Sequence, residues 1–319
     1  MPIAAARESA KLGRVSLMPS ADARIALGDS GLAVAPLGWG MWRLADQQGE
    51  SVRSRVEAAL EAGCTLFDTA DIYGYHRGRG FGIAESLLGG LLREAPQLRE
   101  RMVLATKAGI APPAPYDSSR QYLIAACDAS LRRLNVECID LFQIHRPDLL
   151  THPAEVARAL DELRRAGKIR AAGVSNYSAA QFEALAHHLP FALASVQNEL
   201  SPLAIEALTD GTLDAAMKHG AAVIAWSPLA QGRLMPGGLA DSARTERVIA
   251  ALESIAQRAG VSRAAVAYAW VMAHPARPIP LIGSQNPANI RAARAAYGVD
   301  LTREEWYRVL VAARGAPMP

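Results

Sequence analysis

The segment LFDTADIYG (66–74) begins as a short apolar run and ends in polar side chains, among them Asp68 and Tyr73. The same change recurs in VLATKAG (103–109), which contains a lysine, and in DLFQIHRPD (140–148), which contains a histidine. Short runs rich in Val, Ile, Leu and Phe are typical of buried strands in a parallel sheet. Because α/β enzymes carry their reactive groups just past the ends of such strands, we expect these polar side chains to meet in one pocket.

These runs are part of a regular alternation of strand-like and helix-like segments. The predicted strands are 35–39, 65–68, 102–107, 139–144, 170–174, 193–197, 222–226 and 280–283. The predicted helices cover 51–62 and 118–134, and others begin at Pro153, Ser178, Ser262 and Thr302. Eight strands alternating with helices favour a single (β/α)8 TIM barrel of the α/β class. An open doubly wound sheet is the alternative, although no Gly-x-Gly-x-x-Gly motif follows an early strand.

The chain is expected to form one domain, since no linker rich in Pro or Gly divides it. In this interpretation residues 1–22 are a loose N-terminal extension and residues 23–319 form the barrel. The segment RIALGDSGLAVAPLG (24–38) alternates on either side of the turn DSG (29–31), which predicts an N-terminal β-hairpin. A length of 319 residues suits a barrel of about 250 residues with extensions.

Composition limits the kinds of partner. With 50% hydrophobic residues, 20% charged residues and a net charge of +3, a basic surface for nucleic acid is not expected. No apolar stretch reaches the ~18 residues of a membrane span, and the N-terminus lacks the apolar segment of a signal peptide. The three cysteines have no Cys-x-x-Cys spacing, which suits free thiols. We expect a cytoplasmic protein with a small-molecule substrate; the oligomeric state is left open.

The side chains at the strand ends have complementary acid–base properties. A tyrosine phenol with its ordinary pKa of about 10 is a poor acid near neutral pH, and a nearby Lys107 ammonium would lower that pKa. Asp68 can supply the carboxylate that a buried ammonium requires. His145 can donate a hydrogen bond to an oxygen held beside Tyr73. Together these groups suit protonation of an oxygen on which negative charge develops, as in reduction of a carbonyl by hydride.

Two other classes of function stay open. A cofactor-binding regulatory or sensor subunit, with incidental slow turnover, could keep all of these side chains. A metal-dependent hydrolase would use His and Asp at strand ends, but the chain has no His-x-His or His-Glu-x-x-His motif, so no metal site is expected.

Seven motifs, taken in order, resemble signatures of the aldo-keto reductase family. They are DTADIYG, ATKAG, QIHRPD, GKIRAAGVSNY, VQNELS, AWSPLAQG and PLIGS. The similarity covers about residues 24 to 300, and HRPD, QNELS and TDGTLD (209–214) resemble the bacterial YdhF-like branch in particular. This resemblance implies a (β/α)8 barrel closed at its base by the hairpin, and reduction of aldehydes or ketones with NADPH.

The resemblance also assigns catalytic roles. It implies that Tyr73 is the general acid in reduction and the general base in alcohol oxidation, and that Lys107 lowers the pKa of Tyr73. Asp68 would pair with Lys107, and His145 would orient the carbonyl group.

A second set of residues would bind the cofactor. The nicotinamide would contact Gly40, Met41, Ser175, Asn176, Gln197 and Trp226. The pyrophosphate and the adenosine phosphate would contact Ser227, Leu229, Gln231, Gly232, Gly283 and Ser284. Hydroxyl and amide side chains can match the donors and acceptors of the nicotinamide carboxamide, and Trp226 can stack on its ring.

The chain departs from the family at the adenosine phosphate. The family often has Lys or Arg shortly after the glycine, where this chain has Gln285 and Asn286. Arg291 or Arg294 would then have to supply the positive charge. We expect NADP(H) as the cofactor, with NAD(H) as the alternative.

Overall fold

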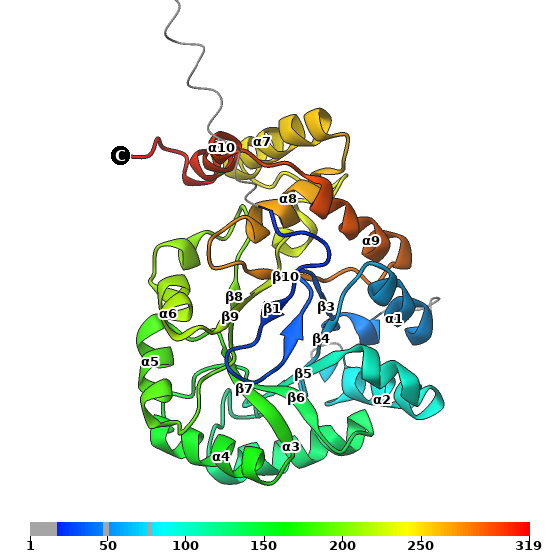
Figure 1. Ribbon diagram of the computed structural model, residues 1–319, viewed down its shortest axis with the longest axis vertical. Helices are drawn as coiled ribbons and strands as arrows, with labels where there is room; N and C mark the ends of the chain where they lie inside the picture. The colour runs from blue at the N-terminus through cyan, green and yellow to red at the C-terminus, as the bar shows by residue number, and fades with distance from the viewer. Residues whose placement is uncertain (1–17, 47–50, 76–77) are drawn as a thin grey trace, which may run out of the picture.

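The computed structural model describes residues 18–46, 51–75 and 78–319 (Figure 1). Most of the predicted extension over 1–22 therefore lies outside the described residues. The described chain forms a ring of helices around a central barrel of strands, and the C-terminus lies beside α10 (Arg303–Arg314). Among the described residues, none of the helices combines the length and apolar character that crossing a bilayer requires.

Parallel strands close the barrel in the order β10-β3-β4-β5-β6-β7-β8-β9. Their bounds are β3 (Gly38–Gly40), β4 (Leu66–Asp68), β5 (Val103–Ala108), β6 (Ile139–Ile144), β7 (Ile169–Ser175), β8 (Ser195–Glu199), β9 (Ala222–Trp226) and β10 (Ile279–Ile282). Neighbours in the sequence are neighbours in the barrel, and β10 returns to pair with β3. This ring confirms the predicted (β/α)8 barrel, and the open-sheet alternative is wrong.

A short antiparallel hairpin closes one end of the barrel. Its strands are β1 (Ile25–Ala26) and β2 (Ala33–Val34), and β1 lies across the centre of the helix ring in Figure 1. The hairpin buries Ile25, Leu27, Leu32 and Val34. They pack in one cluster with interior side chains such as Leu66, the first residue of β4. The hairpin therefore covers the end of the barrel where the strands begin, as predicted, and leaves their carboxyl ends accessible.

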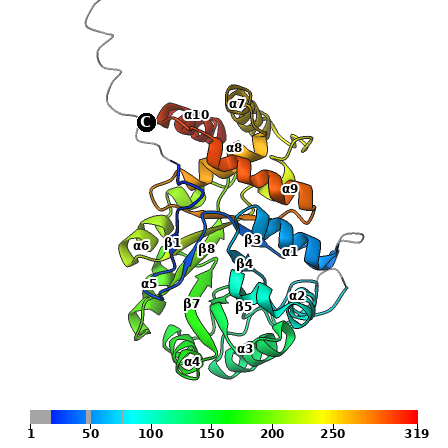
Figure 2. The same ribbon diagram turned by 45° about the vertical axis from the view of Figure 1, so that its right-hand side comes forward.

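Helices form the outer layer. Within the described residues they are α1 (Val52–Glu61), α2 (Ile83–Glu94), α3 (Arg120–Leu134), α4 (Pro153–Arg165), α5 (Ala179–His188), α6 (Thr212–His219), α7 (Ala243–Ala259), α8 (Arg263–Met272), α9 (Pro287–Ala292) and α10. Short 3-10 helices are η2 (Leu44–Asp46), η4 (Pro96–Arg101), η5 (Glu206–Leu208), η6 (Ala230–Gly232) and η7 (Ala293–Gly298). Figure 2 shows α7 and α10 side by side next to α8, outside the ring formed by the other helices.

Several helices begin at the capping residues that the sequence predicts. The side chains of Ser51, Ser178, Ser262 and Thr302 each accept a hydrogen bond from a backbone N–H in the first turn. At Thr302 the Glu305 side chain completes a capping box. These hydrogen bonds satisfy donors that a helix start otherwise leaves unpaired.

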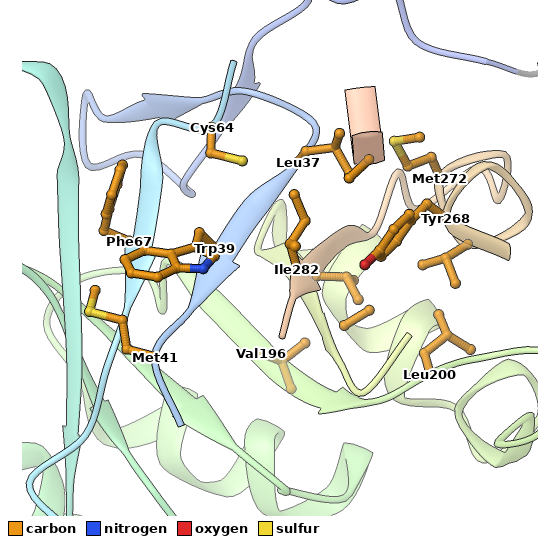
Figure 3. Packing of buried hydrophobic residues seen from close by; sticks show 14 of the residues in the cluster. Leu37, Trp39, Met41, Cys64, Phe67, Val196, Leu200, Tyr268, Met272 and Ile282 are labelled. Carbon is orange, nitrogen blue, oxygen red and sulfur yellow. The ribbon is translucent and has the colours of Figure 1, made fainter. Parts of the chain in front are cut away.

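Large apolar side chains fill the space between strands and helices (Figure 3). Trp39 of β3 and Phe67 of β4 are fully buried and meet edge to face, with ring centroids 5.7 Å apart. Met41 packs in the same cluster, as does Tyr268 of α8. Burial of aromatic rings of this size contributes strongly to stability, so the outer layer holds the strand ends in fixed positions.

The contact between α2 and α3 depends on one glycine. A Cβ atom at Gly89 would lie 1.9 Å from the backbone carbonyl oxygen of Arg133, whereas a Cβ at the next residue, Gly90, would meet nothing within 4 Å. We expect Gly89→Ala to lower the free energy of unfolding by about 1–3 kcal/mol, because the two helices must move apart. The matched control Gly90→Ala should raise it by up to about 1 kcal/mol, because Ala favours helix. Urea unfolding measures both, and equal effects would contradict this account of the packing.

Candidate active site

The carboxyl ends of the barrel strands surround a cavity of about 580 Å³, a volume in the range of small-molecule sites. Asp68 is the last residue of β4, Tyr73 lies in the turn that follows, and His145 comes directly after β6. All three line the cavity, and Lys107 of β5 is fully buried behind them. The structure thus brings together the four side chains that the sequence placed at consecutive strand ends.

Lys107 connects the acid and the phenol. Its Nζ donates hydrogen bonds to Asp68 Oδ2 at 2.6 Å, to the Thr69 carbonyl oxygen at 2.9 Å and to Tyr73 Oη at 3.1 Å. These three bonds use all the donors of the ammonium group. Burial lowers the pKa of Lys107, but the charges of Asp68 and Tyr73 and the hydrogen bonds to both outweigh it, so the pKa is raised. Lys107 is therefore charged at neutral pH.

The second carboxylate oxygen of Asp68, Oδ1, is held in place by two glutamine side chains. Oδ1 accepts hydrogen bonds from Gln197 Nε2 at 3.0 Å and from Gln143 Nε2 at 3.3 Å. Gln143 Oε1 in turn accepts a hydrogen bond from Ser195 Oγ at 3.4 Å. Gly173 makes room for this polar layer, because a Cβ atom there would lie 2.2 Å from Ser195 Oγ. The carboxylate is thus fixed by β5, β6 and β8 inside the barrel.

The pKa of Tyr73 differs from the expectation. Burial raises it, the charge of Lys107 lowers it and the charge of Asp68 raises it again, and the net result is a pKa above the ordinary value. The lowering by Lys107 is therefore present but does not dominate, because the phenol is buried and the ammonium is already paired with a carboxylate. Tyr73 holds its proton at neutral pH.

His145 faces Tyr73 across the cavity, with the two rings edge to face at a centroid distance of 5.8 Å. Its backbone is fixed on both sides: its N–H donates to the Ala108 carbonyl at 2.8 Å, and its carbonyl accepts from Asn176 Nδ2 at 3.2 Å. Burial lowers the pKa of the imidazole well below its usual value, and the charges of Lys107 and Arg146 lower it further. His145 is therefore neutral at physiological pH.

The lowered pKa of His145 implies that the stability of the folded protein depends on pH. The unfolded chain binds a proton at His145 below about pH 6.5, whereas the folded protein does not, so stability is lost as the pH falls through that value. We expect the wild type to lose up to about 1.4 kcal/mol more per pH unit than His145→Gln between about pH 6.5 and pH 5. Urea unfolding across this range measures it. Burial also lowers the pKa of His274. His274 is present in both proteins, so its contribution to the pH dependence cancels in the comparison. Parallel pH profiles would contradict a neutral His145.

Four of the residues predicted to hold the nicotinamide form one hydrogen-bonded row in the cavity wall. Trp226 Nε1 donates to Asn176 Oδ1 at 3.1 Å, and Asn176 Nδ2 donates to Ser175 Oγ at 2.8 Å. Ser175 Oγ donates to the Gln197 carbonyl oxygen at 3.0 Å. The row ties together the ends of β7, β8 and β9 and fixes the side chains of Ser175, Asn176 and Trp226. The Gln197 side chain is held separately by its hydrogen bond to Asp68 Oδ1.

The remaining predicted cofactor residues divide into two groups. The cavity wall includes Gly40, Ser227, Leu229, Gln231, Gly232, Gly283 and Ser284. Ser227 and Gln231, like Asn176, have left-handed backbone, with φ of 51°, 59° and 60° respectively. Non-glycine residues in this conformation carry strain, which is often found at ligand sites.

Two predicted residues, Met41 and Arg291, are not in the cavity wall. Met41 is fully buried in the outer apolar cluster, because its side chain points toward the helices rather than into the barrel. Arg291 of α9 forms a hydrogen-bonded ion pair with Glu61 of α1 on the exposed surface. Their assignment to the cofactor therefore has no geometric support here.

Sequence reasoning missed other wall residues. They are Arg43, Ile72, Ile110, Arg146, Pro228, Tyr268, Leu281 and Asn289. Ile72 and Arg146 adjoin predicted residues within the same motifs, so the signal was available there. Tyr268 lies on α8, whose apolar sequence indicates a core helix and gives no sign of a cavity residue.

Comparisons with known proteins agree with this geometry. The Aldo/keto reductase family model matches residues 36–311. The chain is 52% identical to a 6-dehydroglucose reductase of Novosphingobium aromaticivorans, over 92% of this chain and 96% of that protein. It is 38% identical to the Escherichia coli oxidoreductase YdhF, over 93% and 99% respectively. A solved structure of a thermostable aldo-keto reductase has the same fold, with a TM-score of 0.76 at 24% identity, covering 91% of this chain and 99% of that one.

These matches span nearly the whole barrel, and the motifs around Asp68, Lys107 and His145 lie within the matched region. Members of the matched family are oxidoreductases that use nicotinamide cofactors. The chain belongs to the aldo/keto reductase family and to its YdhF-like branch.

Proposed function

We propose that the protein reduces aldehydes with a nicotinamide cofactor, or oxidises the corresponding alcohols, and that Tyr73 transfers the proton. The observation that supports this proposal is the contact of Lys107 with both Asp68 and Tyr73. Lys107 Nζ lies 2.6 Å from Asp68 Oδ2 and 3.1 Å from Tyr73 Oη. One domain over 23–319, in the cytoplasm, would hold cofactor and substrate in the same cavity.

Proton transfer follows from the states of these groups. The raised pKa of Tyr73 keeps the phenol protonated, which is the form a general acid requires. As the proton leaves Oη for the carbonyl oxygen, the Lys107 ammonium, already bonded to Oη, stabilises the phenolate. Asp68 keeps that ammonium in place. In the opposite direction, the phenolate takes the proton of the alcohol.

His145 orients the carbonyl in this proposal. Its neutral imidazole carries one N–H, so it can donate a hydrogen bond without acting as an acid. Nδ1 is buried and has no hydrogen-bond partner among the described residues. Nε2 is then the nitrogen available for a carbonyl oxygen held next to Tyr73 Oη.

The cavity wall fits a nicotinamide. A bound nicotinamide supplies the hydride in reduction and receives it in oxidation. Asn176 Oδ1 has a lone pair left after accepting from Trp226, and Gln197 Oε1 has no hydrogen bond with a described residue. Both can accept from the carboxamide NH2 group. Trp226 is half-buried in the wall, where its ring can cover the nicotinamide.

We propose NADP(H) as the preferred cofactor, with weak discrimination against NAD(H). Ser284 lines the cavity, whereas neither Arg291 nor Arg294 does and Arg291 pairs with Glu61, so the 2′-phosphate would be held by polar groups rather than by either of these arginines. We expect NADPH to bind more tightly than NADH by no more than about tenfold, which corresponds to about 1.4 kcal/mol. Quenching of tryptophan fluorescence on titration gives both dissociation constants. Equal or tighter binding of NADH would exclude the NADP preference.

A sugar aldehyde is the proposed substrate. Two relatives are 6-dehydroglucose reductases, at 52% identity in Novosphingobium aromaticivorans and 36% in Agrobacterium fabrum. The test is oxidation of NADPH, followed by its absorbance, with 6-dehydroglucose and with a panel of simple aldehydes. Absence of turnover with every carbonyl and with both cofactors would exclude the reductase. The regulatory alternative has no support from the geometry or the comparisons.

A further inference from the structure

Arg146 is a cation in the cavity wall that the proposed mechanism does not use. It directly follows His145 and is half-buried. Within residues 18–46, 51–75 and 78–319, its guanidinium group makes no hydrogen bond and no ion pair. A guanidinium has five N–H donors and no acceptor, so the donors of Arg146 are available to a molecule bound in the cavity.

Two other partly buried arginines, Arg99 and Arg133, pair with carboxylates. Arg99 Nη1 lies 2.8 Å from Asp140 Oδ2, and Arg133 Nε lies 2.6 Å from Glu85 Oε2. These pairs follow the general rule that a buried charge is compensated by a carboxylate or a carbonyl oxygen. Arg43 and Arg146 both line the cavity without such a pair among the described residues, and Arg146 is the one that directly follows His145, so its donors are placed to meet a molecule bound beside His145.

The position of Arg146 limits which part of a bound molecule it can contact. Arg146 directly follows His145 and lines the same cavity as Tyr73, and its charge acts to lower the pKa of Tyr73, His145 and Glu199. The backbone before it is held by the Asn176 hydrogen bond to the His145 carbonyl oxygen at 3.2 Å. The strand end therefore places this cation in the wall of the cavity that also contains Tyr73 and His145.

We propose that Arg146 binds an oxygen on the carbon next to the substrate carbonyl, so that the site selects hydroxylated aldehydes over plain alkyl aldehydes. This inference rests on the proposed function and specifies its substrate class. A hydroxyl oxygen can accept a charge-assisted hydrogen bond from the guanidinium while the carbonyl oxygen contacts Tyr73 and His145. An alkyl aldehyde offers no acceptor to the guanidinium, so it should bind less well than a hydroxylated aldehyde.

The test compares glyceraldehyde with propanal, two aldehydes of equal carbon number. The wild type and Arg146→Met are assayed with both at saturating reduced cofactor. We expect the ratio of kcat/KM for glyceraldehyde over propanal to fall by about 10- to 100-fold in Arg146→Met, mainly through KM. Arg146→Lys keeps the charge and one donor group and should recover part of the ratio. Thermal unfolding checks that each variant is folded.

Three outcomes would overturn the inference. An unchanged ratio would show that Arg146 does not contact the hydroxyl group. An equal fall for both aldehydes, with a shifted pH profile of kcat, would mean that it acts only through Tyr73. Glyceraldehyde 3-phosphate is assayed in the same way, and a loss of activity confined to it would assign Arg146 to an anionic group instead. If the wild type reduces neither aldehyde nor any other carbonyl, the proposed function itself fails, which distinguishes the two failures.

Discussion

Replacing Tyr73 with phenylalanine is expected to lower kcat for aldehyde reduction by about 10²- to 10⁴-fold, the contribution of a positioned general acid. The change removes only Oη. It keeps the ring, which meets His145 edge to face at 5.8 Å, and leaves Lys107 bonded to Asp68 and to the Thr69 carbonyl oxygen. The cavity should therefore keep its shape while losing the proton that the carbonyl oxygen receives.

The measurement is steady-state reduction of one aldehyde by the wild type and Tyr73→Phe at several pH values. Cofactor binding, followed by quenching of tryptophan fluorescence, serves as the control. We expect it to persist, because the row of Ser175, Asn176, Gln197 and Trp226 does not bond to Oη. Equal rates in the two proteins would refute the assignment of Tyr73 as the acid.

The sequence was sufficient for the barrel and for the convergence of the four side chains. Parallel strands are buried on both faces, so they appear as short apolar runs whose ends can be located closely. Asp68 and Lys107 lie toward the carboxyl ends of β4 and β5. Because these two strands pair in the barrel, Lys107 Nζ lies 2.6 Å from Asp68 Oδ2. Helix α2 was not predicted, because Gly89 and Gly90 interrupt its helical pattern.

Other properties depend on how deeply a side chain is buried and on where it points, and neither can be read from the sequence. The pKa of Tyr73 is raised because desolvation outweighs the charge of Lys107, and the depth of burial is a property of the folded cavity. Met41 follows a cavity strand, yet its side chain is turned into the outer cluster. Arg291 was a candidate by its position in the chain, and only the fold showed it paired with Glu61. Arg146 was overlooked because a single arginine in a loop usually lies on the surface.

Lys107→Met is expected to reduce both stability and activity. Lys107 and Asp68 are each 1% exposed or less, and the substitution leaves the Asp68 carboxylate buried without its cation. Breaking a buried pair by removing one partner costs about 3–5 kcal/mol. Activity should also fall by about 10²- to 10³-fold, because the Tyr73 phenolate loses the positive charge that stabilises it. Urea unfolding and steady-state reduction measure the two effects separately.

The double variant Asp68→Asn/Lys107→Met separates the two roles of the pair. Asparagine keeps an oxygen that can accept from Gln143 and Gln197, as Asp68 Oδ1 does, but it carries no charge. The double variant should therefore be more stable than Lys107→Met alone, by up to the few kcal/mol that an uncompensated buried charge costs. Its activity should remain as low as that of the single variant, since Tyr73 Oη still has no ammonium beside it. A double variant that is no more stable than Lys107→Met would show that the lost packing of Lys107, rather than the stranded charge of Asp68, accounts for the destabilisation.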